Sequence, residues 1–378
     1  MSKSLGQFES LEHGSAGEIN RPEKDYRKKL FGQLITDAES ELSKLGFPEE
    51  TWQIKIELIK AMVLEGDIES AEREAKTIPL NEEYIEYVSN AFLSIVKGLA
   101  KENPKKALEL MPNILDENQY SEALFEVLKA ISDKWELEEI QKLADQIIEI
   151  PCRYYQIEAR LVVTEVLAAK GQIEAARGKA QQEPGPTNQL RAYLLIYKSS
   201  QASEDIEAAR ALATKCDYQP WEEWLQIAKT TRDPNDVTTA RKEIASINDI
   251  VTKGKQTTHF KERALIKLAK ITGKTEDIQT AREATIAADR QSLLMEFARF
   301  TRSDADIDLL RKSGKNPSEH FDALASVAEI TKQESDFRAA YEAAKELRTI
   351  PKVALGEYLR SNAFAELAQI LQGETLRR

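Results

Sequence analysis

Few residues in this chain combine the types and spacing that chemistry requires. The three histidines, His13, His259 and His320, are scattered, and none has a Cys, Asp or His partner at a metal-ligand spacing such as i, i+4. The sequence contains no glycine-rich phosphate loop and no nucleophile elbow. Adjacent carboxylates such as Glu138 and Glu139 are typical of the solvated faces of acidic helices. We therefore expect no catalytic site, no metal, no cofactor and no enzyme activity.

Basic residues provide the clearest candidates for binding. Four of them follow one another at i, i+4, i+7 and i+11, on one side of a predicted helix: Arg263, Lys267, Lys270 and Lys274. Lys253 and Lys255 stand close by, in an insert over residues 248–258. This basic stripe could receive a carboxylate-rich partner or the acidic front half of a neighbouring copy. A plain solvated helix face is the simpler alternative.

A second set of basic residues recurs once in each of five successive segments: Arg177, Arg210, Arg241, Arg282 and Arg311. Glu174, Glu207 and Asp308 stand three residues before three of these arginines, within reach on a helix. Local pairing is the interpretation we favour. The functional alternative is an arginine ladder that binds an acidic peptide or phosphates.

Repeated segments carry these arginines. Close copies of Asp205-Ile206-Glu207-Ala208-Ala209-Arg210 recur along the chain, each at the start of a segment with helical apolar periodicity. They align on a small or apolar contact position, which is occupied by Ala71, Ala107, Ile140, Ala176, Ala209, Ala240, Ala281, Leu310 and Ala340. The intervals run from 29 to 41 residues with a mean of about 34, in the range of stacked helical hairpins.

The residue four positions before the contact position is Asp or Asn in most copies. Its side-chain oxygen could accept a hydrogen bond from the first helical turn, so we predict it to be the N-cap. The predicted caps are Asp67, Asn103, Asp205, Asp236, Asp277, Asp306 and Asp336.

Composition supports an all-α fold. The chain has 378 residues, 42% hydrophobic and 31% charged, and no region shows sustained alternation of apolar and polar residues. We predict a disordered tail over 1–20, an N-terminal capping helix within 21–49, helical repeats over 50–350 and a C-terminal capping helix and tail over 351–378. The sequence shows no signal peptide and no apolar run of membrane-spanning length, so we expect a cytoplasmic protein without a membrane span. Export without a cleaved signal leaves no such mark.

Charge is distributed unevenly along the chain. Residues 1–150 contain 31 acidic and 18 basic residues, whereas the remainder is close to neutral, and the total is −11. An acidic front half argues against binding nucleic-acid phosphates along the whole array, because such binding depends on Lys and Arg. Cys152 and Cys216 are too few for a disulfide framework, which favours a reducing compartment.

Two segments, Gly66-Asp67-Ile68-Glu69-Ser70-Ala71 and Gly171-Gln172-Ile173-Glu174-Ala175-Ala176, resemble the inter-helix turn of tetratricopeptide repeats. The resemblance covers about residues 50–350. That family has an aromatic residue four positions after the Ala and a Pro about twelve after it. Here Ala75 and Ala180 take the first place, and Pro79 and Pro184 come only eight residues on.

The resemblance implies a right-handed α-solenoid of about nine helical hairpins, with the first helix of each hairpin lining a concave surface. It also implies a scaffold or adaptor that holds a protein or an extended peptide, of acidic character if the basic stripe is the site. The alternative is a repeat protein that binds single-stranded RNA. The acidic front half and the irregular intervals count against that alternative.

Overall fold

A computed structural model describes residues 32–38, 40, 48–216, 220–247, 259–347 and 362–370. Within these ranges every regular element is a helix, so the prediction of an all-α fold is confirmed. The predicted tail over 1–20, most of both predicted capping segments, and the 248–258 insert with Lys253 and Lys255 lie outside the described residues.

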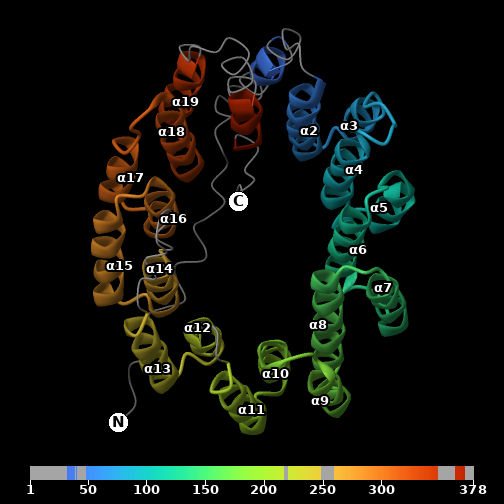
Figure 1. Cartoon of the computed structure of the whole chain (residues 1–378), viewed down its shortest axis with the longest axis vertical. Coiled ribbons are helices and arrows are strands. Elements are labelled where there is room, and N and C mark those ends of the chain that lie inside the picture. The colour runs from blue at the N-terminus through green and yellow to red at the C-terminus, as the bar shows by residue number, and fades with distance from the viewer. Residues whose placement is uncertain are drawn as a thin grey trace, which may run out of the picture.

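The described helices alternate between an inner and an outer layer (Figure 1). The inner layer consists of α2 (Pro48–Glu65), α4 (Ile85–Ala100), α6 (Glu117–Ile131), α8 (Arg153–Ala169), α10 (Pro186–Ser200), α12 (Pro220–Thr231), α14 (Phe260–Thr272), α16 (Gln291–Thr301) and α18 (Pro317–Thr331). The outer layer consists of α3 (Ile68–Ala75), α5 (Pro104–Leu110), α7 (Leu137–Glu149), α9 (Ile173–Gln182), α11 (Ser203–Ala213), α13 (Pro234–Ala245), α15 (Thr275–Ala288), α17 (Asp304–Arg311) and α19 (Glu334–Glu346). A short 3-10 helix, η1 (Met111–Asn113), follows α5. Each inner helix packs on the next inner helix and on the outer helix that follows it, so packing runs from neighbour to neighbour.

The contact positions predicted from the repeat hold each outer helix against its neighbours. Ala209, Ala240, Ala281 and the other predicted contact residues are all fully buried. A small side chain at this point lets the helix backbones approach closely, and the apolar residues around it fill the remaining space. The alignment of the repeats therefore located the buried face of the outer helices correctly.

The predicted N-caps are only partly confirmed. Asp67 caps α3 by accepting the Ser70 N–H at 3.1 Å, and Asn103 caps α5 in the same way through Lys106 N–H. The prediction is wrong for Asp205, Asp236, Asp277, Asp306 and Asp336, which occupy the third residue of their helices. These helices begin three residues earlier than expected, and their aspartates have other partners.

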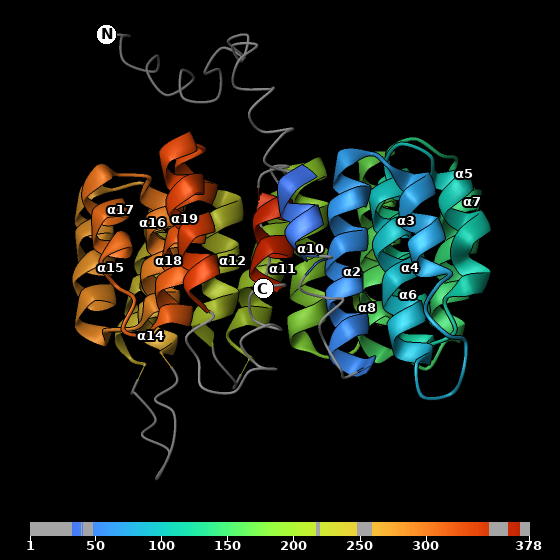
Figure 2. The ribbon, with the colours of Figure 1, turned by 90° about the horizontal axis from the view of Figure 1, so that it is seen from above.

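Successive hairpins curve into a closed ring (Figure 1), which Figure 2 shows from its edge. Residues 32–38 and 362–370 are both helical and lie together at the junction between α2 and the last hairpin. Their apolar side chains form one core with α2, α18 and α19, which includes Leu34, Leu58, Phe321, Phe337 and Phe364. The sequence predicts these segments at opposite ends of a stack, whereas the structure brings them into contact.

Hydrogen bonds between the two ends reinforce this ring junction. The Tyr341 hydroxyl donates to Asp37 Oδ2 at 2.8 Å and accepts from Gln33 Nε2 at 3.1 Å. On the other side, Gln369 Nε2 donates to Glu57 Oε2 at 2.8 Å. Burial, followed by the hydrogen bond to Asp37, raises the pKa of Tyr341 to about 12, so the hydroxyl keeps its proton at neutral pH.

Candidate functional site

The five repeated arginines form a ladder of ion pairs, but each partner comes from the next hairpin. Each guanidinium reaches the aspartate at the third position of the following outer helix, at distances of 2.7–3.0 Å: Arg177–Asp205, Arg210–Asp236, Arg241–Asp277, Arg282–Asp306 and Arg311–Asp336. In the first four pairs Nε and Nη2 bind the two carboxylate oxygens separately, which is the strong bidentate geometry.

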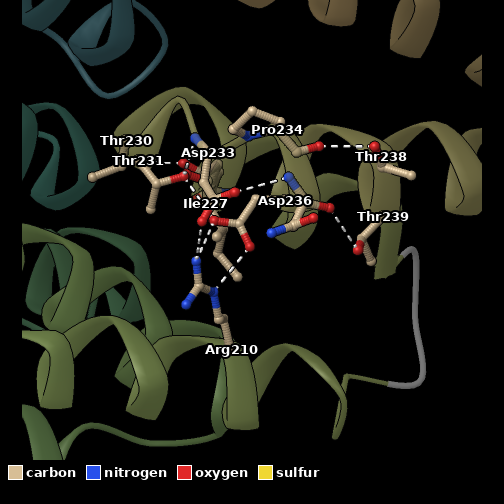
Figure 3. A network of polar contacts seen from close by, with 11 residues as sticks. Arg210, Ile227, Thr230, Thr231, Asp233, Pro234, Asp236, Thr238 and Thr239 are labelled. Carbon is tan, nitrogen blue, oxygen red and sulfur yellow. Dashed lines mark hydrogen bonds and ion pairs between the residues drawn. The ribbon is translucent and has the colours of Figure 1, made fainter.

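A hydroxyl five residues before each aspartate completes the arrangement. Thr231 donates to Asp236 Oδ2 at 2.8 Å, beside the Arg210 guanidinium (Figure 3). The hydroxyls of Ser200, Thr272, Thr301 and Thr331 do the same for the other four aspartates. Each carboxylate therefore also ties its outer helix to the end of the inner helix before it.

Four of these turns use a residue other than glycine in the left-handed conformation, with φ between 49° and 56°: Gln201, Arg232, Arg302 and Lys332. The fifth turn has Gly273, with φ 62°. This conformation costs roughly 1–2 kcal/mol in a residue with a Cβ. The hydroxyl, aspartate and arginine on either side hold the turn in place despite that cost.

Hydrogen bonds within the ladder shift the pKa values of its aspartates and arginines. Burial alone would raise the pKa of Asp205, Asp277 and Asp306, but hydrogen bonds from their arginine and hydroxyl partners outweigh it and lower the pKa. In the same way, the hydrogen bond to Asp306 raises the pKa of Arg282 despite partial burial. Both members of each of these pairs are thus charged at neutral pH.

This geometry gives the arginines a structural role between hairpins. Local pairing, which the sequence favours, is present only as an addition: Glu174 contacts Arg177 and Asp308 contacts Arg311, both at 2.7–2.8 Å. Because the donors are already directed at buried carboxylates, the ladder offers little to an outside peptide or phosphate. The signal that could have revealed the partner is the Ser or Thr that precedes each aspartate by five residues.

Three residues of the basic stripe, Arg263, Lys267 and Lys270, lie on α14, an inner helix, whereas Lys274 follows that helix as the N-cap of α15. The two central lysines bridge to the neighbouring inner helices. Lys267 Nζ contacts Glu222 of α12 at 2.9 Å, and Lys270 Nζ contacts Glu296 of α16 at 2.9 Å. Arg263 and Lys274 are exposed. The structure thus places the stripe on the inner layer and gives its two central charges intramolecular partners.

A hollow of about 560 Å³ lies on the inner layer between four successive helices. Its lining comes from α6, α8, α10, α12 and the residue that follows α12: Phe125, Lys129, Glu158, Leu161, Val162, Glu165, Arg191, Leu194, Leu195, Lys198, Gln226, Lys229, Thr230 and Arg232. Five lining residues are cationic and two are anionic, so the hollow has a net positive charge. Its volume is in the range of ligand-binding clefts in proteins. The sequence analysis did not single out these residues.

Two buried glutamates lie near the turn between α9 and α10. Burial raises the pKa of Glu183, although the nearby Arg160 opposes the effect with a contact of 3.0 Å. Burial also raises the pKa of Glu223, which accepts a hydrogen bond from the Thr187 hydroxyl at 3.0 Å. These carboxyls are enclosed among helices, so we assign them to packing.

Within the described part of the chain, no group of three or more His, Cys, Asp or Glu side chains could hold a metal ion. Cys152 and Cys216 do not form a disulfide with each other. No helix in the described ranges has the length and apolar character needed to cross a bilayer. We find no match between this chain and any protein-family model, and none to a curated protein.

Proposed function

We propose that this protein is a scaffold that holds an extended segment of another protein on the inner layer of its helical ring. In this proposal the chain is a right-handed array of about nine hairpins related in design to tetratricopeptide repeats. It acts by binding and performs no catalysis.

The observation that supports this proposal is that the outer and inner layers use their charged side chains differently. In the outer layer, arginines and aspartates of neighbouring helices from α9 to α19 pair with each other. The inner helices instead carry a hollow and exposed basic residues. An inner layer of parallel helices offers a long, continuous surface that suits an extended peptide.

Site-specific photo-crosslinking can test this function. We would place a photoreactive residue at Arg263 on inner helix α14, and as a matched control at Ile286 on outer helix α15, which is 49% exposed. Both proteins would be irradiated in cell extract, and captured species identified by mass spectrometry. The proposal expects one protein segment to be captured from Arg263 and not from Ile286.

Capture of the same species from both positions would contradict binding on the inner layer. Capture of RNA from the inner position alone would replace the protein partner with a nucleic acid. A purified form of the captured protein must then crosslink to the same position, which separates direct binding from co-purification.

A further inference from the structure

The hollow between α6 and α12 gathers three cations without carboxylate partners at one place on the inner layer. Several lysines of the inner helices have carboxylate partners: Lys97 contacts Glu122, Lys129 of the lining contacts Glu126, and both central lysines of the basic stripe are paired. Among the described residues, the side chains of Lys198, Lys229 and Arg232 contact no carboxylate. All three are exposed and line the hollow.

These three cations come from the ends of two adjacent inner helices. Lys198 is in the last turn of α10, Lys229 is in the last turn of α12, and Arg232 follows α12 directly. The helix dipole favours a cation at each helix end, which accounts for a lysine at each place. It does not account for three unpaired cations at one cavity, where their mutual repulsion opposes the arrangement.

The floor of the hollow is aliphatic. Leu161 and Leu194 are 4% and 5% exposed, and Val162 and Leu195 are half-buried beside them. Of the two anions in the lining, Glu158 is held by Arg191 at 2.7 Å, and Glu165 is exposed without a cationic partner among the described residues. The surface therefore combines an apolar base with an edge of net positive charge, where three unpaired cations outnumber one unpaired carboxylate. Such a surface is complementary to a segment that has aliphatic and acidic side chains together.

An acidic peptide fits this surface better than single-stranded RNA does. Sequence-tolerant RNA binding relies on exposed aromatic rings on which bases stack. Among the residues of the lining, Phe125 is the only aromatic one, and it is 8% exposed with the Lys129 ammonium 5.3 Å from its ring centre. Leucine and valine side chains bury aliphatic groups and offer no stacking platform.

We infer that the hollow lined by α6, α8, α10 and α12 is the docking site for an extended acidic peptide, whose carboxylates bind Lys198, Lys229 and Arg232 while its aliphatic side chains rest on Leu161 and Leu194. The inference rests on the proposed scaffold function and adds to it the place and the chemistry of the partner. The basic stripe on α14 becomes a secondary surface, because its central charges are already paired.

The test uses the full chain and a short fluorescein-labelled peptide of alternating glutamate and leucine, followed by fluorescence anisotropy. We expect the double variant Lys229→Gln, Arg232→Gln to bind this peptide about tenfold more weakly than the unaltered chain. The matched control is Lys215→Gln, Lys242→Gln, which removes the same charge from exposed positions in the outer layer, at α13 and just after α11. The control should bind like the unaltered chain.

Two further ligands test the apolar floor and the choice of partner. Replacing leucine by serine in the peptide should weaken binding about fivefold if the leucine floor is used. Equal affinity of both double variants would overturn the site. Tighter binding of an oligouridylate of the same length than of the peptide would overturn the choice of partner.

The outcomes also distinguish this site from the scaffold function. The double variant Lys229→Gln, Arg232→Gln could bind the peptide like the unaltered chain while the photoreactive residue at Arg263 still captures one protein segment. In that case the scaffold function stands and the hollow is wrong as the site. Unchanged helical circular dichroism in each variant ensures that a loss of binding reflects the surface and not unfolding.

Discussion

The front and rear halves of the ring join their hairpins in different ways. From α2 to α10 the hairpins share one continuous apolar core. From α10 to α18 the core divides into separate clusters, one for each junction between hairpins. The Arg–Asp pairs occupy those rear junctions and the one that precedes them.

The contrast shows how one repeat can be stabilised by two kinds of force. A continuous core stabilises the front half despite its acidic charge, because apolar burial does not depend on charge. The rear half buries smaller patches and adds a directional ion pair that fixes the position of each hairpin on the next. We expect the two halves to respond differently to mutation, pH and salt.

The largest effect should come from removing apolar bulk in the front half. Leu128 is fully buried in the continuous core, so Leu128→Ala should lower the free energy of unfolding by about 2–5 kcal/mol. Denaturant unfolding at low and high salt would measure it. A loss that changes strongly with salt would contradict an apolar origin.

Next comes the removal of one ladder arginine. Arg282→Leu leaves the Asp306 carboxylate, 3% exposed, without its cation and should cost about 3 kcal/mol, at the low end for buried pairs because Arg282 is partly exposed. The double variant Arg282→Leu, Asp306→Leu should recover most of this loss. A double-mutant cycle from denaturant unfolding measures the coupling.

The matched control for this cycle is an exposed pair in the same half. Lys315 and Asp289 are 65% and 75% exposed and in contact at 2.5 Å, so Lys315→Ala should change stability by less than about 1 kcal/mol. An equal cost for both variants would show that the ladder pairs are ordinary surface pairs.

Acid should destabilise the rear half before the front half. The pKa values of Asp205, Asp277 and Asp306 are lowered by folding, so their contribution is complete above about pH 4 and is lost as pH falls through the folded values. Glu183 and Glu223 have raised pKa values and act in the opposite sense, since protonation relieves the cost of burying their charge. The net loss should therefore start only below about pH 4.

Tryptophan fluorescence can assign that acid transition to a half. Trp52 and Trp135 lie in the front half, and Trp221 and Trp224 in the rear. A variant with both front tryptophans changed to Phe reports the rear, and the reciprocal variant reports the front. We expect the rear transition at the higher pH; coincident transitions would mean that the ring unfolds as one unit.

A smaller effect is expected at the ring junction. Tyr341→Phe removes the hydroxyl that donates to Asp37 and should cost about 1 kcal/mol. Hydrogen exchange should rise in 32–38 and 362–370 and stay unchanged in α6 and α8. Uniform faster exchange throughout the ring would contradict a local role.

The smallest effect should be a gain in stability. Arg302 adopts φ 49° at the end of α16, a conformation that glycine accepts without steric cost, so Arg302→Gly should stabilise by about 1 kcal/mol. Gly273 occupies the equivalent place after α14, and Gly273→Ala should give a loss of similar size. Thermal unfolding of both variants tests the pair.

The sequence predicts the parts of this fold that depend on nearby residues. Contact positions such as Ala209 are correctly predicted because residues three and four apart in the sequence lie on the same face of a helix. The partner of Arg210 was missed because Asp236 lies 26 residues away, in the next hairpin. The local sequence favours N-caps at these aspartates because nothing local shows that four of the inner helices end in a left-handed residue other than glycine.

Ring closure and the candidate hollow are harder to predict. Closure depends on the small rotation added at each hairpin, summed over the whole array, and no single residue encodes that sum. The hollow combines side chains from Phe125 to Arg232, across four inner helices, so its charge balance emerges only once the helices are stacked. Most of the basic stripe was visible because Arg263, Lys267 and Lys270 lie on a single helix, α14.

The ring junction also bears on the order in which the chain folds. Its hydrogen bonds join residues 304–312 positions apart, whereas the ladder pairs span 24–36 positions. Hairpins and the contacts between neighbouring hairpins can thus form early through short loops. The ring junction instead requires an array that is already curved, and its loop-closure entropy cost grows with chain length. We expect the last kinetic phase of refolding to be the protection of 32–38 and 362–370 in pulsed hydrogen exchange, and Tyr341→Phe to slow that phase alone.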